Sequence, residues 1–141
     1  RFSRRENLHL TLAFIGEADE ASARRIASAL RSLPPHALTM DLAGVGVFRS
    51  GILWAGLAEK NELEKMSLEV RELLKRLGIS FDAKPFRAHI TLARDWRGPE
   101  PGALPRLPRM TGLKTKVFAA RLFESYRNER GAVCYRPISI E

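Results

Sequence analysis

Hydrophobic and polar positions follow two different patterns along the chain, and each pattern predicts one kind of secondary structure. Helical spacing with one apolar face predicts a helix from its cap at Asp19 to about Ser32, and another over 61–77 that closes at Gly78. Residues 95–111, which hold four of the eight prolines, predict a loop. Short apolar stretches bounded by turn residues predict strands at 8–15, 38–48, 52–58 and 86–93, and a closing hairpin of 116–126 and 132–140. Interleaved helices and hairpins are typical of the α+β class with mostly antiparallel sheets.

One apolar segment occurs twice. The hexapeptide LHLTLA at 8–13 returns as AHITLA at 88–93, so that His89 lies 80 positions after His9. This period is too long for a solenoid and instead predicts two related lobes. Because side chains alternate along a strand, the histidine and threonine of each copy share one face, while the aliphatic residues between them point into a core.

Composition limits the class of protein. The chain has 141 residues, of which 45% are hydrophobic and 28% charged, as expected for one globular domain. Its apolar stretches are too short to span a bilayer. A lone cysteine, Cys134, provides neither a disulfide framework nor a thiolate cluster, and we expect a reducing, cytoplasmic location.

Charge is distributed unevenly. The 24 Lys and Arg outnumber the 16 Asp and Glu, which gives a net charge of +8. Residues 1–70 carry nine basic and nine acidic side chains, whereas residues 71–141 carry fifteen basic and seven acidic ones. The pattern fits either a solvated basic surface or a polyanionic partner that binds the second half.

The repeated His-x-Thr pair indicates phosphoryl chemistry. Displacement at phosphorus needs a base on the entering oxygen and an acid on the leaving oxygen, and histidine serves both roles near neutral pH. The hydroxyls of Thr11 and Thr91 are suited to stabilise the charge on the phosphate oxygens. A single histidine in a strand is more often structural, but two near-identical copies favour catalysis by His9 and His89 over that alternative.

Two other readings of the histidines carry less weight. The remaining histidine, His36, has no such context, and we expect it on the surface. Two histidines without cysteine or carboxylate at ligand spacing make a poor metal shell, so we expect no metal.

The two segments 7–17 (NLHLTLAFIGE) and 84–94 (KPFRAHITLAR) resemble the paired signatures of the two-histidine (2H) phosphoesterases, and within them the LigT-like RNA 2',3'-cyclic phosphodiesterases, also called 2'-5' RNA ligases. Residues 45–48 (VGVF) and 53–56 (LWAG) also resemble that group. The resemblance implies a bilobal fold of two antiparallel sheets around a cleft, without a cofactor. It also implies a single domain over 1–141 that lacks a strand and a helix which the family has before the first motif.

The resemblance also implies roles for individual residues. His9, Thr11, His89 and Thr91 would form the phosphate site, with His89 activating water and His9 protonating the leaving 3' oxygen to give a 2'-phosphate. Arg94 matches the family's usual residue after the second motif. Contact with phosphate and a structural salt bridge both remain open for it.

Further contacts with substrate are expected around this site. Three aromatic side chains either stack on an RNA base or belong to the core: Phe14, Phe48 and Trp54. Arg97 belongs to a basic loop suited to the RNA backbone, together with Arg106, Arg109 and Lys114. The expected partner is an RNA with a 2',3'-cyclic phosphate end, including tRNA fragments, bound by a monomer that does not engage a membrane.

Three alternatives remain for the activity. The same site can run in reverse and join the cyclic end to a 5'-hydroxyl. A phosphodiesterase acting on a small cyclic nucleotide would carry the same residues. A non-catalytic RNA-binding module would keep the fold but need neither histidine.

Overall fold

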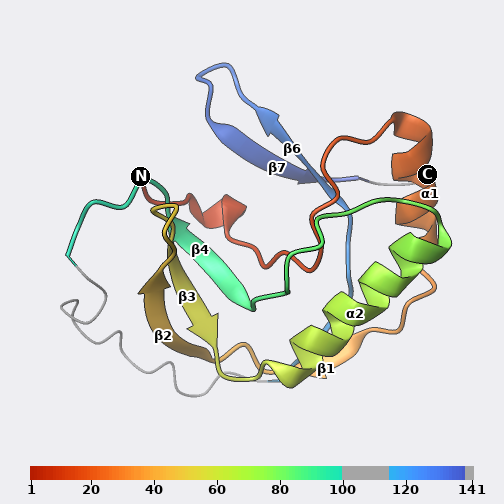
Figure 1. Ribbon diagram of the computed structural model, residues 1–141, viewed down its shortest axis with the longest axis horizontal. Coiled ribbons are helices and arrows are strands. Elements are labelled where there is room, and N and C mark those ends of the chain that lie inside the picture. The colour runs from red at the N-terminus through yellow and green to blue at the C-terminus, as the bar shows by residue number, and fades with distance from the viewer. Residues whose placement is uncertain (100–114, 139–141) are drawn as a thin grey trace.

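A computed structural model describes residues 1–99 and 115–138 (Figure 1). Its helical elements are a short 3-10 helix η1 (Arg5–Asn7) and the helices α1 (Glu20–Leu30) and α2 (Asn61–Arg76). The strands are β1 (His36–Leu38), β2 (Leu42–Val47), β3 (Leu53–Leu57), β4 (His89–Ala93), β5 (Lys116–Phe118), β6 (Phe123–Arg127) and β7 (Val133–Pro137). The α+β class expected from the sequence is confirmed.

The strands form three small antiparallel sheets with the orders β2-β3-β4, β1-β5 and β6-β7. The first sheet is extended at its β4 edge by the start of the chain. Arg1 and Arg94 exchange backbone hydrogen bonds of 3.0 and 2.8 Å, Phe2 bridges Ala93, and Ser3 N donates to Leu92 O at 2.8 Å. The hairpin of β6 and β7 projects from the body of the molecule at the top of Figure 1.

Both halves of helix α2 pack into the hydrophobic core, each in a separate cluster of buried residues. Its second half packs on α1 in a cluster of Ile26, Leu30, Val70, Leu73 and Leu74. Its first half packs on β1 and β3 in a cluster of Leu38, Leu57, Leu63 and Met66. Both predicted helix signals hold: Asp19 caps α1 by accepting a 2.7 Å hydrogen bond from Ser22 N, and Gly78 adopts a φ of +72° just after α2.

The strand predicted at 8–15 is wrong. This segment has no ladder partner among the described residues, and a strand exists only where another strand pairs with it. Isolated hydrogen bonds hold it instead: Ser67 Oγ donates to Leu12 O at 2.7 Å, and Asp82 N donates to Phe14 O at 2.8 Å. The alternation of side chains nevertheless survives, because His9 and Thr11 are exposed while Leu10 and Leu12 pack against the core.

Three further strand predictions change in extent. The predicted strand 38–48 is divided, because β1 leaves to pair with β5 while β2 pairs with β3. The predicted strand 116–126 is divided for the same reason, and only its second part, β6, forms the closing hairpin with β7. The predicted strand 86–93 keeps only its last five residues as β4.

Candidate active site

The second histidine motif is held in the three-stranded sheet. His89 begins β4 and pairs with Gly56 of β3, and Thr91 pairs with Trp54. Paired residues and residues two apart share a face of a sheet, so His89, Thr91 and Trp54 lie on one side. Gly46 lies opposite Trp54, where a Cβ would sit 2.2 Å from the indole Cζ2. The close approach of the indole therefore requires glycine at this position.

The first histidine motif lies beside the β6–β7 hairpin. Asn7 Nδ2 donates a 3.1 Å hydrogen bond to Val133 O at the start of β7. The ring of Tyr135, two residues along β7, packs against the ring of His9 with 4.4 Å between centroids. His9 and Thr11 are both exposed, so water and substrate have access to them.

Both histidine rings are held in the same way. His9 Nδ1 lies 2.6 Å from the carbonyl oxygen of Asn7, and His89 Nδ1 lies 2.7 Å from that of Arg87. A carbonyl oxygen only accepts hydrogen bonds, so Nδ1 carries the proton in each ring. This leaves Nε2 of each histidine as the nitrogen that takes or gives a proton. The two copies of the sequence motif thus hold their histidine rings by the same hydrogen bond.

An aromatic side chain from a neighbouring hairpin supports each histidine. Phe48, which follows β2, meets His89 edge-on with 5.1 Å between ring centroids, whereas the ring of Tyr135 is tilted by 50° against that of His9. Sequence reasoning did not identify Tyr135. The repeated hexapeptide was the available signal, because two related lobes imply a hairpin beside each motif. Tyr135 is the aromatic residue in the middle of the second strand of the hairpin beside the first motif.

The two motifs meet on one core. Leu10 of the first motif and Ile90 of the second both pack against the cluster at the first half of α2. Ser3, six residues before His9, is bonded to Leu92 of β4. The structure thus ties both His-x-Thr pairs to the same part of the molecule.

The other predicted substrate contacts are spread around this region. Phe48 is half-buried and touches Trp54 and His89, while Phe14 is 63% exposed. Arg94 and Arg97 are exposed, and neither pairs with an acid among residues 1–99 and 115–138. Arg106, Arg109 and Lys114 lie outside the described residues. The roles of all these residues in binding stay predictions.

The expectation that His36 is an ordinary surface residue is wrong. Its side chain is only 12% exposed and lies between two carboxylates of α2, with Nδ1 3.0 Å from Glu62 and Nε2 2.8 Å from Glu69. The hydrogen bonds to Glu62 and then Glu69 raise the pKa of His36 above the ordinary value of 6.5. His36 therefore has a structural role, which is to dock β1 onto α2.

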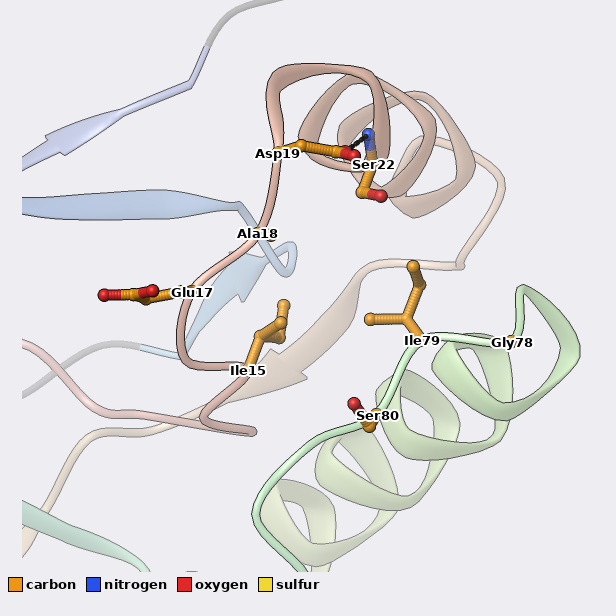
Figure 2. Close-up of a pocket in the computed structure, with 8 residues that line it drawn as sticks. All are labelled: Ile15, Glu17, Ala18, Asp19, Ser22, Gly78, Ile79 and Ser80. Atoms are coloured by element: carbon orange, nitrogen blue, oxygen red, sulfur yellow. Dashed lines mark hydrogen bonds between the residues drawn. The ribbon is translucent and has the colours of Figure 1, made fainter.

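The hollow drawn in Figure 2 contains no histidine. It encloses about 230 Å³ between the start of α1 and the end of α2, and its lining includes Glu17 and Asp19. Two carboxylates make it a poor place for a phosphate. Within the described residues, no three His, Cys, Asp or Glu side chains are grouped as metal ligands, and no helix is both long and apolar enough to cross a membrane.

Comparison with known proteins places this geometry in a family. The family model described as LigT like Phosphoesterase matches residues 1–54 and 56–135. The chain is 32% identical to the RNA 2',3'-cyclic phosphodiesterase of Aeropyrum pernix, over 91% of this chain and 78% of that protein. It is 34% identical to the protein of the same name from Geobacillus stearothermophilus, over 73% of this chain and 36% of that protein.

Solved structures agree with these relatives. The structure of E. coli LigT complexed with 3'-AMP matches with a TM-score of 0.75 and 26% identity, over 99% of this chain and 78% of that chain. The chain spans between about a third and about half the length of several curated relatives, with 36% for the Geobacillus protein and 52% for that of Archaeoglobus fulgidus. The family model, the relatives and the shared fold together show that the chain belongs to the LigT-like phosphoesterase family.

Proposed function

We propose that this chain hydrolyses the 2',3'-cyclic phosphate end of RNA to a 2'-phosphate. The observation that carries the proposal is the paired geometry of His9 and His89, each with Nδ1 bonded to the carbonyl two residues before it and a threonine two residues after it. Relatives named RNA 2',3'-cyclic phosphodiesterase support the choice of reaction.

In the proposed mechanism, both histidines act through Nε2. His89 takes a proton from water, whose oxygen attacks phosphorus. The bond from phosphorus to the 3' oxygen breaks, and His9 gives that oxygen its proton. The hydroxyls of Thr11 and Thr91 donate to the non-bridging oxygens, where negative charge grows in the transition state. The hydrogen bonds to the carbonyls of Asn7 and Arg87 fix the orientation and the tautomer of each ring.

RNA is preferred over a small cyclic nucleotide because of the charge around the second motif. Arg87, Arg94 and Arg97 are exposed near β4, and the excess of basic residues lies entirely in the second half of the chain. Arginine binds phosphate with two parallel hydrogen bonds, and each backbone phosphate neutralised adds to affinity at low salt. We further propose that the chain acts as a cytoplasmic monomer on RNA ends, including tRNA fragments.

Turnover of a short RNA that ends in a 2',3'-cyclic phosphate tests the proposal. Wild type in EDTA is compared with His9→Ala and His89→Ala, and a His36→Gln variant provides a matched change at the histidine outside the site. We expect a 2'-phosphate product, unchanged by EDTA, and a loss of at least a hundredfold in kcat for each alanine variant. His36→Gln should retain activity at temperatures where it is folded. An inactive wild type, or alanine variants as active as wild type, would contradict the proposal.

A further inference from the structure

We propose that Arg87 binds the phosphodiester group that lies one nucleotide upstream of the cyclic end. This inference rests on the proposed function and deepens it, because it identifies what makes an RNA end a better substrate than a mononucleotide. The expected ligand is the internucleotide phosphate of a single strand.

Arg87 contacts Phe48, which in turn contacts His89. Its guanidinium carbon lies 6.0 Å from the centroid of the Phe48 ring, and that centroid lies 5.1 Å from the centroid of His89. Because the two distances share the Phe48 centroid, the guanidinium lies within about 11 Å of the His89 ring. It is therefore close enough to contact the same substrate as His89.

The charge of Arg87 is available to a ligand. The residue is exposed, and no carboxylate pairs with it among residues 1–99 and 115–138. By contrast, two other arginines of the described part pair with acids: Arg24 with Glu20, and Arg136 with Glu124. A free guanidinium at the edge of a phosphate site is suited to a second phosphate, which it binds through two parallel N–H donors.

Phe48 makes this arginine a rigid donor. A guanidinium that lies over an aromatic ring is held by the charge on the ring face, so it loses less side-chain entropy when it binds. The Phe48 ring is itself fixed by Trp54, at 5.3 Å, and by His89. With Arg87, His89 and Trp54 around it, Phe48 is better placed to support the arginine than to stack on a base.

The backbone and side chain of Arg87 are separable. Its carbonyl oxygen holds His89 Nδ1, and this contact survives any change of side chain. Substitution of Arg87 therefore keeps the hydrogen bond between its carbonyl and His89 Nδ1, and tests the guanidinium alone.

The test compares two substrates, a dinucleotide that ends in a 2',3'-cyclic phosphate and a 2',3'-cyclic mononucleotide, which has no upstream phosphate. For Arg87→Gln we expect kcat/KM on the dinucleotide to fall on the order of tenfold, chiefly through KM, with no change on the mononucleotide. The slope of log(kcat/KM) against log[salt] for the dinucleotide should become shallower by about 0.7. Arg87→Lys, which keeps the charge, should keep the slope and lose part of the affinity.

Arg76→Gln is the matched control, because Arg76 is an exposed arginine in the last turn of α2. It should change neither substrate. An equal loss on both substrates with Arg87→Gln would place the guanidinium on the reacting phosphate and overturn the inference, as would no loss on either. A wild type that turns over neither substrate would remove the proposed function, and this inference with it.

Discussion

Ser67→Ala is the sharpest test of how the first motif is held. Ser67 is 1% exposed in the middle of α2, and its hydroxyl donates a 2.7 Å hydrogen bond to the carbonyl oxygen of Leu12, next to Thr11. The segment has no strand ladder among the described residues, so this bond is one of the few that fix it. Alanine removes the bond and leaves the carbonyl without its donor.

The magnitude follows from three contributions. Loss of the hydrogen bond costs about 1 kcal/mol, and the half-buried carbonyl left without a donor adds about 1 kcal/mol more. Alanine is a better helix former than serine, which offsets about 0.5 kcal/mol. The free energy of unfolding should therefore fall by about 1.5 kcal/mol, or roughly 4 °C in Tm for a chain of this size.

Urea denaturation at fixed pH measures this change, with the slope m expected to stay constant while the midpoint falls. Ser28→Ala is the matched control, because Ser28 is an exposed serine inside α1. It should leave stability unchanged or raise it by a few tenths of a kcal/mol. If Ser67→Ala proved as stable as Ser28→Ala, the hydroxyl would not hold Leu12, and the account of the first motif would be refuted.

Two other changes give distinct results. Gly46→Ala places a methyl group 2.2 Å from the Trp54 indole, so it should cost about 1–3 kcal/mol by overpacking, and a folded variant should show altered tryptophan fluorescence; an unchanged protein would contradict the close approach. His36 protonated donates to both Glu62 and Glu69, and its raised pKa means that this stabilisation is complete below about pH 6.5 and lost as pH rises through the folded-state pKa. Urea denaturation of wild type and His36→Gln should therefore show a stability difference at pH 6 that shrinks above pH 7, and a difference independent of pH would refute the two-carboxylate contact.

Sequence patterns predicted those features that depend on neighbouring residues. The two helices and their ends follow from apolar spacing, the cap at Asp19 and the glycine at Gly78. The outward face shared by His9 and Thr11 likewise follows from alternation along an extended chain, and it holds even though no strand forms there. Local spacing therefore correctly predicted that His9 and Thr11 face outward, whereas His89 and Thr91 are half-buried.

Features that depend on distant partners could not be predicted in this way. Whether 8–15 becomes a strand is decided by a ladder partner elsewhere in the chain, and the division of 38–48 is decided by β5, about 80 residues away from β1 in sequence. His36 looks unremarkable beside Pro34 and Pro35, and only the packing of β1 on α2 brings Glu62 and Glu69 to its ring. Each miss reflects tertiary pairing that no local pattern records.

The pairing of the first residues with β4 has a mechanical consequence. Ser3 is bonded to Leu92, and His9 follows it by only six positions, with three of the five residues between them in the short 3-10 helix η1. With extended residues rising about 3.3 Å and 3-10 residues about 2.0 Å each, the segment from Ser3 to His9 spans at most about 16 Å. While the pairing lasts, His9 cannot move further than that from Leu92 of β4, the strand that also carries His89, so chain length limits how far apart the two histidine motifs can move.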